Sequence, residues 1–428
     1  MKEFHRLSLE RGGTMHKRYP IQKRALIALL TAVATALSSC GVRLSENKTA
    51  ESATEIMTTT PGSERTEALP SSIVIDFEDP ENNGVSEKIL RYMNSVEFHG
   101  VVLAARDGEV IFEGAYGYAD HREKTATRTD TVFELGSITK QFTAVAVMML
   151  VEQGKLSLDD PISLYIPEYP YADGITVRNL LSMTSGIPDY VTCGALGFGM
   201  EDIASASNES LEALGEVRSI IEKEYTPAEI VRLISDYSLL FEPGEEFAYS
   251  NTNYYFLGII IEKISGVSYF DFIEENFFIP LGMDHTSTET SSLTSKGAIL
   301  LYNGAIYLPS QNKTLSFAAG SICSDARDLL LWENAVLDGK FLTPDGWAQM
   351  FDPGRFGYGF GWHIQSGYYE HSGNTVGYNS HVLIKPESKI VVIALSNTQG
   401  LDEYYTDGRV KSDRVCKDIY TILSGDSG

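Results

Sequence analysis

The sequence has few cysteines, and their placement excludes several kinds of protein. The four are Cys40, Cys193, Cys323 and Cys416, and none has the Cys-x-x-Cys or Cys/His spacing typical of a zinc site. So few thiols cannot supply a disulfide framework, although one bridge among the last three is left open. We therefore expect a fold that does not depend on disulfides, and no metal ion is implied.

Basic residues are also scarce. Lysine and arginine number 34 against 58 aspartate and glutamate residues, which gives a formal net charge of −24. The first 39 residues alone carry +5, so the remainder carries −29. Such a surface repels phosphate backbones and excludes nucleic acid as an expected partner. The hydrophobic fraction of 43% and the charged fraction of 21% are ordinary for a soluble globular protein.

The apolar run near the N-terminus is too short to span a membrane. Ala25–Leu37 has 13 residues, against the ~20 that a spanning helix needs, and four basic residues between positions 17 and 24 precede it. The run leads into Leu37–Gly41, which resembles the lipobox of bacterial lipoprotein signal peptides. The resemblance implies cleavage before Cys40 and lipid attachment to its thiol, and an ordinary secretory signal is the alternative. Either reading places the mature chain outside the cytoplasm, and the first anchors it to a bacterial membrane.

Composition divides the chain into three parts. Residues 1–39 are the expected signal peptide. Residues 40–83 are rich in Ser, Thr, Glu and Pro and predict a flexible tether, in which a short strand at Ser72–Phe77 remains an option. Residues 84–428 predict one folded domain of mixed α and β structure.

Two hairpins stand near the ends of this domain. Val101–Arg106 and Glu109–Gly114 flank Asp107-Gly108, a strong signal for a two-residue hairpin turn. Val382–Lys385 and Ile390–Leu395 form a second hairpin pattern. Strands at both ends of a domain predict a single sheet that contains strands from its N-terminal and its C-terminal part.

Helical patterns occupy the middle and the end of the domain. They cover Ser137–Gln153, Pro227–Tyr237, Asn253–Ser265 and Arg409–Leu423. The order of elements predicts an α/β protein of the α+β type. Its antiparallel β-sheet is flanked by N- and C-terminal helices and carries an inserted all-helical subdomain at roughly residues 154–250. Residues 191–225 are expected to form a surface excursion near the cleft.

Several common catalytic signatures are absent, including G-x-S-x-G, H-E-x-x-H, the Walker loop and G-x-G-x-x-G. What remains is Ser137-x-x-Lys140 at the start of an apolar-periodic helix. Helical residues three apart have Cβ atoms roughly 5–6 Å apart, so Lys140 can reach the Ser137 hydroxyl. An amine with a lowered pKa can accept the serine proton, and the helix N-terminus adds N–H groups where an oxyanion would form. A helix cap followed by a solvated lysine fits the same spacing.

Seven segments in a fixed order carry a family resemblance. They are Phe133–Thr143, Leu180–Pro188, Phe241–Gly244, Phe247–Asn251, Pro280–Met283, Tyr358–Trp362 and His371–Gly373. Together they resemble the serine β-lactamase and penicillin-binding-protein superfamily, specifically its class C β-lactamase-like branch. The resemblance covers roughly residues 84–424 and implies a β-lactamase/transpeptidase-like fold. The branch also includes D,D-peptidases, D-aminopeptidases and esterases.

The resemblance implies three catalytic residues. Ser137 would be the nucleophile that forms an acyl-enzyme, and Lys140 would help to deprotonate it. Tyr249 would act as general base and then as acid to the leaving group. We expect nearby cationic groups to make its phenol more acidic.

The resemblance also implies residues that bind the substrate. Asn251 would orient Lys140 and the substrate amide. The backbone N–H groups of Ser137 and Asn374 would form the oxyanion hole, next to Gly373 of the third motif. Tyr190 lies near the place of a substrate-contacting side chain, on a loose alignment.

The third motif departs from the pattern Lys-Thr-Gly of many penicillin-binding enzymes. His371 replaces the lysine that attracts a substrate carboxylate, and a histidine is neutral or partly charged at neutral pH. The departure makes efficient β-lactamase action less expected than cleavage of an uncharged ester or amide.

The expected function is that of an extracytoplasmic serine hydrolase acting through an acyl-enzyme on an amide or ester. Candidate substrates are D-amino-acid peptides, peptidoglycan-type peptides and small esters. The alternatives are a β-lactamase and a non-catalytic lipoprotein that binds penicillin or peptidoglycan. No organic cofactor is implied, the expected partners are a small-molecule or peptide substrate and the membrane, and the oligomeric state stays open.

Overall fold

The computed structural model describes residues 56–58, 71–75, 80–196, 211–301, 304–400 and 410–425. The expected signal peptide, Cys40 and most of the expected tether lie outside these ranges. Within them, no helix is both long enough and apolar enough to cross a membrane.

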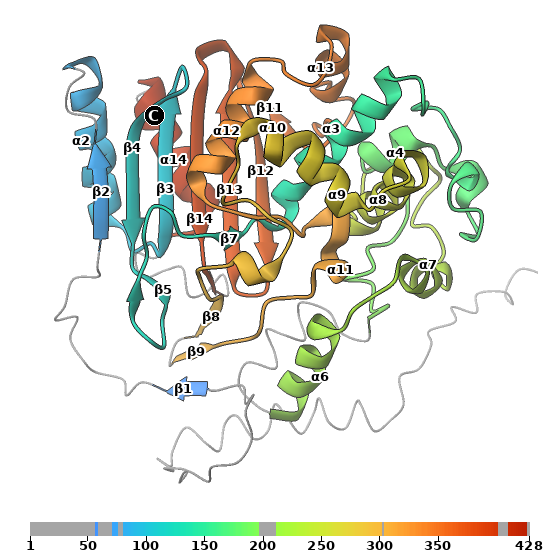
Figure 1. The fold of residues 1–428 in the computed structure, drawn as a ribbon, viewed down its shortest axis with the longest axis horizontal. Coiled ribbons are helices and arrows are strands. Elements are labelled where there is room, and N and C mark those ends of the chain that lie inside the picture. The colour runs from blue at the N-terminus through green and yellow to red at the C-terminus, as the bar shows by residue number, and fades with distance from the viewer. Residues whose placement is uncertain are drawn as a thin grey trace, which may run out of the picture.

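A seven-stranded antiparallel sheet forms the centre of the fold (Figure 1). Its strands run in the order β11 (His363–Gln365), β12 (Tyr368–Thr375), β13 (Tyr378–Lys385), β14 (Ile390–Ser396), β3 (Gly100–Arg106), β4 (Glu109–Tyr116) and β2 (Ser71–Ile75). Every neighbouring pair is antiparallel. Because β3 pairs with β14, strands from the two ends of the domain meet inside one sheet, which confirms the predicted fold class.

Both predicted hairpins are present. Asp107 and Gly108 join β3 to β4 with φ angles of 52° and 83°. Two successive positive φ angles are the signature of a type I′ turn, whose twist matches that of the flanking strands. The second hairpin joins β13 to β14 through a short 3-10 turn at Pro386–Ser388 and Lys389, whose φ is 44°.

Helices cover both faces of this sheet. On one face lie α2 (Pro80–Ser95) and α14 (Ser412–Ser424), and on the other lie α3 (Thr139–Glu152) and α12 (Ala326–Leu337), with α8 (Asn251–Ser265) packed against α3. We call these the α14 face and the α3 face. Because side chains alternate along a strand, Val102 of β3 packs toward the α14 face and Leu103 toward the α3 face. Burial on both faces explains why β14 is buried along its whole length.

The folded part begins earlier than the expected boundary at residue 84. Strand β2 starts at Ser71 and pairs with β4, and α2 starts at Pro80. The run Ile73-Val74-Ile75 supplies the β-branched residues that favour an edge strand here. The expected tether therefore contains a strand of the main sheet, close to the optional strand at Ser72–Phe77.

Smaller elements complete the described chain. A four-stranded sheet has the order β1 (Ile56–Thr58), β9 (Gly304–Ile306), β8 (Ala298–Leu301) and β15 (Thr398–Gly400), and two-stranded sheets join β10 (Cys323–Ser324) to β7 (Phe133–Glu134) and β5 (Tyr118–Asp120) to β6 (Thr125–Ala126). Short helices are α9 (Tyr269–Ile273), α10 (Ile279–Leu281), α11 (Lys313–Ser316) and α13 (Pro344–Met350). The three cysteines in the described ranges, Cys193, Cys323 and Cys416, are free thiols.

The region between residues 154 and 250 is helical where the structure describes it. It contains α4 (Val177–Leu181), α6 (Leu211–Glu222) and α7 (Pro227–Ser235), and its described residues include no strand. Helix α6 falls inside the expected surface excursion, yet its Val217 and Ile221 are buried in the main core. One face of this segment is therefore an integral part of the packing around the cleft.

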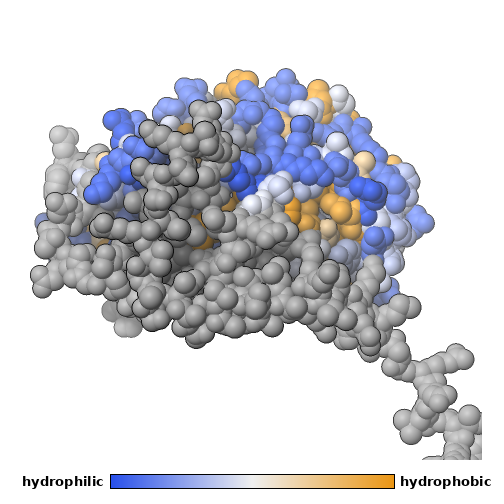
Figure 2. Space-filling model, turned by 90° about the horizontal axis from the view of Figure 1, so that it is seen from below, coloured by the Kyte–Doolittle hydropathy of each residue, from blue (hydrophilic) through white to orange (hydrophobic). Residues whose placement is uncertain are grey.

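The surface is mainly polar on the side of the molecule shown in Figure 2. Hydrophilic residues make up most of the coloured area there, and separate hydrophobic areas lie between them. This distribution agrees with the net charge of −24.

Candidate active site

Ser137 lies in a single 3-10 turn between β7 and α3. The turn covers Gly136–Ile138, and α3 itself begins at Thr139, two residues later than the predicted helix. Gly136 has a φ of 56°, and a Cβ atom there would lie 2.9 Å from the backbone nitrogen of Asn374. Glycine at this position lets the chain that carries Ser137 approach β12 closely.

Lys140 is fully buried directly behind Ser137. Its Nζ lies 2.9 Å from Ser137 Oγ, 2.8 Å from Asn251 Oδ1 and 2.8 Å from the Ala319 carbonyl oxygen. Three acceptors match the three donors of an ammonium group, and a neutral amine can instead accept the Ser137 proton. The alternative of a helix cap followed by a solvated lysine is therefore wrong.

Burial gives Lys140 the properties of a base. It lowers the pKa of this amine to about 7, and the negative charge of Asp189 opposes the shift. No carboxylate contacts the amine directly among the described residues, so burial dominates. A substantial fraction of Lys140 is therefore neutral near pH 7 and able to accept a proton.

Tyr249 lies two residues before the start of α8, with its ring beside Lys140. The distance from Lys140 Nζ to the ring centroid is 5.0 Å. The hydroxyl oxygen is buried and has no hydrogen-bond partner of good geometry among the described residues. Burial raises the pKa of this phenol, although the nearby Ser137 hydroxyl lowers it. The expectation of a more acidic phenol is thus wrong, and Tyr249 holds its proton.

Asn251 is the first residue of α8 and bridges the Lys140 amine and the Asp189 carboxylate. Its Oδ1 accepts a hydrogen bond from Lys140, and its Nδ2 donates to both Asp189 carboxylate oxygens at 3.3 Å. Asp189 was not singled out by the sequence analysis. The available signal was its position as the acidic residue directly after the segment Leu180–Pro188.

His371 is buried on β12, and its ring centroid lies 6.1 Å from that of Tyr249. Only 2% of it is exposed, and it does not belong to the described residues that line the cavity next to Ser137. Its Nδ1 lies 2.7 Å from the Ser372 carbonyl oxygen, which can only accept, so Nδ1 carries the proton. Its Nε2 then accepts from the Tyr358 hydroxyl at 3.1 Å.

Burial, together with His363 and Lys140, holds the pKa of His371 well below its usual value. The imidazole is therefore neutral. The expected role of His371 in substrate binding stays a prediction.

A cavity opens beside Ser137. Its described lining consists of Gly136, Ser137, Tyr190, Val191, Leu196, Ile221, Asn251, Gln311, Leu315, Ser316, Ala319, Gly320, Asn374, Thr375 and Val376. None of these lining residues is a lysine, arginine or histidine. Tyr190 forms part of the wall, but its hydroxyl is occupied because it donates to the Leu315 carbonyl.

The end of β12 presents Asn374 to this cavity. Val376 and Gly377 join β12 to β13 after the pair Thr375–Tyr378. In a two-residue hairpin that closing pair exchanges hydrogen bonds and the next pair does not, so the Asn374 N–H faces away from β13. Strand β11 pairs only with Tyr368–Glu370, so no described strand covers β12 on that side near Asn374.

Gly373 allows β12 to lie against the nucleophile turn. A Cβ atom at Gly373 would lie 1.8 Å from the Leu135 carbonyl oxygen and 2.4 Å from Ser380 Oγ. Any side chain here would push the strand away from Ser137. Gly373 thus acts through close approach of the backbone.

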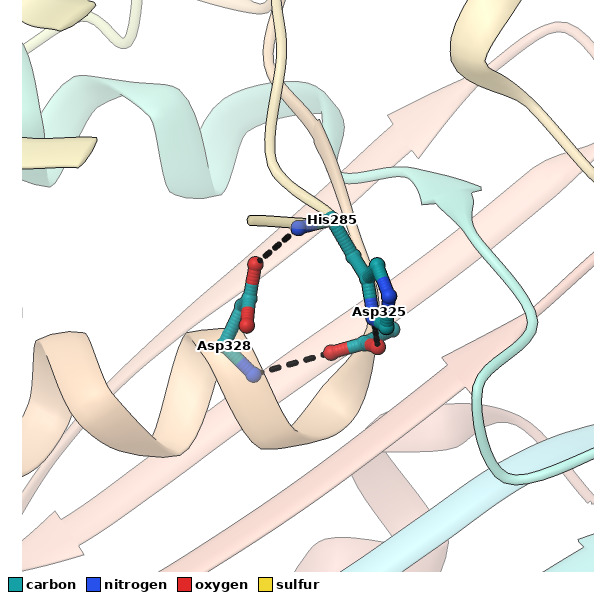
Figure 3. A group of neighbouring side chains, drawn as sticks. All are labelled: His285, Asp325 and Asp328. Carbon is teal, nitrogen blue, oxygen red and sulfur yellow. Dashed lines mark hydrogen bonds and ion pairs between the residues drawn. The ribbon is translucent and has the colours of Figure 1, made fainter. Parts of the chain in front are cut away.

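One group of side chains in the described chain could hold a metal ion, and none of its members belongs to the described lining of the cavity beside Ser137. Figure 3 shows His285, Asp325 and Asp328. The imidazole Nδ1 of His285 lies 2.6 Å from Asp325 Oδ2. The backbone N–H of His285 donates to Asp328 Oδ2 at 2.7 Å. Asp325 Oδ1 caps α12 by accepting from the Asp328 N–H at 2.8 Å. The carboxylates are thus engaged in tying this loop to the helix N-terminus.

Comparison with known proteins now places the chain. The model of the family named Beta-lactamase matches residues 85–413. The chain belongs to the beta-lactamase family. Penicillin-binding protein 4* of Bacillus subtilis (strain 168) is 30% identical over 335 residues, which cover 72% of this chain and 70% of that protein. Family membership confirms the expected serine hydrolase class, and this relative supports the expected likeness to penicillin-binding proteins.

Solved structures show the same fold. The octameric penicillin-binding protein homologue from Pyrococcus abyssi has a TM-score of 0.65 and 27% identity, over 80% of this chain and 77% of that one. D-amino acid amidase from Ochrobactrum anthropi SV3, complexed with D-phenylalanine, has a TM-score of 0.66 and 24% identity, over 81% and 99% of the two chains. The expected β-lactamase/transpeptidase-like fold is therefore confirmed.

Proposed function

We propose that this protein is an extracytoplasmic hydrolase that cleaves an uncharged amide or ester through an acyl-enzyme on Ser137. One observation carries the proposal. The Lys140 amine lies 2.9 Å from Ser137 Oγ, and burial lowers its pKa to about 7. A base poised near the working pH, in hydrogen-bond contact with a hydroxyl, is what serine activation requires.

Proton transfers follow from the two pKa shifts. The Ser137 proton moves to the neutral Lys140 amine as Oγ bonds to the substrate carbonyl carbon. Tyr249 keeps its proton because burial raises its pKa, so it acts as the acid that protonates the leaving amine or alcohol. The Lys140 ammonium then returns a proton to the phenolate. Water repeats the sequence on the acyl-enzyme, releasing the acid and restoring Ser137.

Backbone N–H groups stabilise the negative charge that develops on the carbonyl oxygen. Ser137 and Asn374 both line the cavity, and Gly136 and Gly373 permit the close approach between their segments. The Asn374 N–H faces away from β13 and is open toward this space. Two fixed donors of this kind form an oxyanion hole and cost no reorganisation during the reaction.

The cavity lining favours an uncharged substrate with an apolar acyl group. Val191, Leu196, Ile221, Leu315 and Val376 contribute apolar surface, and the described lining contains no cationic side chain that would bind a carboxylate. Short esters fit this chemistry. D-amino-acid amides and peptidoglycan-type peptides fit it in that they bring no free carboxylate to the site. The overall charge of −24 further disfavours anionic substrates.

The proposed location rests on the sequence. The run Ala25–Leu37, followed by Leu37–Gly41, supports a lipoprotein signal with Cys40 as the lipidated residue. Replacement Cys40→Ala should abolish metabolic labelling with a fatty acid. Unchanged membrane retention of that variant would contradict a lipid anchor.

A substrate panel tests the activity. We expect kcat/KM for D-phenylalanine amide or p-nitrophenyl butyrate to exceed the values for nitrocefin and for a peptide ending in D-Ala-D-Ala. Faster turnover of nitrocefin than of every substrate without a carboxylate would instead make the protein a β-lactamase. Stable labelling by a fluorescent penicillin without turnover of any substrate would make it a binding protein.

A further inference from the structure

We propose that Asp189 is a positioning residue that acts through the Asn251 amide on Lys140 and sets the pH range in which Lys140 can accept the Ser137 proton. The inference rests on the proposed function, in which Lys140 is that acceptor. Asp189 would touch neither the substrate nor the reacting atoms.

A continuous line of hydrogen bonds connects Asp189 to the nucleophile. The carboxylate accepts from Asn251 Nδ2 at 3.3 Å, Asn251 Oδ1 accepts from Lys140 at 2.8 Å, and Lys140 lies 2.9 Å from Ser137 Oγ. A carboxylate can only accept, so it fixes the orientation of the amide. The opposite orientation would place the Asn251 NH2 group against the Lys140 ammonium.

The chain around Asp189 keeps its carboxylate in place. The Val191 N–H donates to Oδ1 at 3.2 Å, and the Thr192 hydroxyl donates to Oδ2 at 3.3 Å. The Asp189 carbonyl oxygen also accepts from the backbone N–H groups of Thr192 and Cys193. These bonds hold the carboxylate one amide away from Lys140 and prevent a direct ion pair.

The separation matters because a direct ion pair would keep Lys140 charged. Burial lowers the pKa of Lys140 to about 7, and Asp189 opposes this shift across the Asn251 amide. Asp189 thus limits how far burial can depress the amine. The result is a base that changes protonation near neutral pH instead of one that is always neutral or always charged.

The other titratable groups around Lys140 are uncharged in the described structure. On the α8 side they are Tyr249 and Tyr254, whose pKa values burial raises, and on β12 the group is His371, whose pKa burial lowers. Asp189 itself faces Tyr190 and Cys193, whose pKa values are also raised by burial. Within the described residues, Asp189 is therefore the carboxylate that acts on Lys140. Burial raises the pKa of this carboxyl group, and the hydrogen bond from Asn251 and the charge of Lys140 oppose that shift.

The test is the pH dependence of acylation. We would measure kcat/KM for p-nitrophenyl butyrate from pH 5 to 9 in the wild type and in Asp189→Asn, which keeps the size and removes the charge. Loss of the negative charge lowers the pKa of Lys140. The acid limb, centred near pH 7 in the wild type, should therefore move to lower pH by about one unit.

Matched variants separate charge from structure. Asp189→Glu retains the charge and should keep the wild-type midpoint, and Asp189→Ser offers a second uncharged variant if Asp189→Asn does not fold. Asp338→Asn removes an equal charge from an exposed pair with Lys389 and should shift nothing.

The possible outcomes distinguish this inference from the proposed function. An unshifted acid limb in a folded, active Asp189→Asn or Asp189→Ser variant would overturn the role of Asp189 and leave the hydrolase intact. Absence of any acylation in the wild type would overturn the proposed function itself. A shift in Asp338→Asn equal to that in Asp189→Asn would reduce the effect to overall charge.

Discussion

Each face of the seven-stranded sheet carries a serine next to a basic side chain, but we propose a nucleophile only on the α3 face. On the α3 face, Ser137 contacts Lys140. On the α14 face, Ser372 Oγ lies 2.8 Å from His381 Nδ1, and His381 Nε2 lies 3.1 Å from Glu370 Oε2. Strand β12 supplies residues to both faces, because its side chains alternate.

The lysines on these faces differ in their partners. Lys417 of α14 lies 3.2 Å from Glu370, and although burial lowers its pKa, Glu370 holds that pKa above the usual value. Lys140 reaches its carboxylate only through an amide, and burial lowers its pKa to about 7. Lys417 pairs directly with a carboxylate, so it makes a structural contact on the α14 face. Lys140 is buried without a carboxylate in direct contact, so it can act as a base on the α3 face.

The largest expected difference concerns the two serines. Ser137→Ala should abolish labelling by a fluorophosphonate probe and leave the melting temperature nearly unchanged, because little packing is lost. Ser372→Ala is the matched variant and should retain labelling, because its face lacks the cavity and the Asn374 N–H. Gel fluorescence measures both. Full labelling of Ser137→Ala would show that Ser137 is not the nucleophile.

The two lysines provide the second contrast. Lys140→Met preserves the approximate volume and removes the base, so kcat/KM should fall by a factor of ~100 to 10,000. Lys417→Met should leave kcat/KM within a few-fold of wild type, since its ion pair lies on the other face. Steady-state kinetics on one short ester decide between them. Equal losses in both variants would show that Lys140 acts through stability alone.

Replacement of His371 should affect stability more than specificity. His371→Lys places a cation in a buried site beside Lys140, so the free energy of unfolding should fall by about 3 kcal/mol or more. His381→Gln on the α14 face should cost less, about 1–3 kcal/mol, because it removes hydrogen bonds and introduces no buried charge. Urea unfolding measures both. A stable His371→Lys enzyme that prefers carboxylate-bearing substrates would show that the side chain at this position binds the substrate.

Stability should also depend on pH through Lys140. In the unfolded chain its pKa is near 10.5, and in the folded protein it is about 7. Between these values the unfolded state binds more protons, so stability rises with pH by up to about 1.4 kcal/mol per unit.

Comparison with Lys140→Met isolates this contribution. The difference in unfolding free energy between wild type and variant should change in favour of the wild type from pH 7 to pH 10. A constant difference across that range would mean that Lys140 is not desolvated in the folded protein.

Much of this arrangement could be predicted from the sequence because it depends on local periodicity. Asp107-Gly108 predicts its hairpin from turn chemistry, and the three-residue spacing of Ser137 and Lys140 predicts their contact. The family motifs predicted that Tyr249 and Asn251 lie in the same site as these two residues.

The parts that could not be predicted depend on packing between distant segments. The protonation of Tyr249 and His371 follows from how deeply they are buried, and burial is decided by residues far away in the sequence. Asp189 matters only because α8 places Asn251 between it and Lys140. The edge strand β2 lies in a segment whose overall composition resembles a linker. Its three consecutive β-branched residues were the only local signal for a strand there.

The most direct test of the central claim is to locate the covalent adduct. The wild-type protein would be incubated with a fluorophosphonate at pH 8, digested and analysed by tandem mass spectrometry. Our account predicts a single modified residue, Ser137, with a labelling rate that falls as pH decreases below about 7. Modification of Ser372 or another residue in place of Ser137 would contradict it.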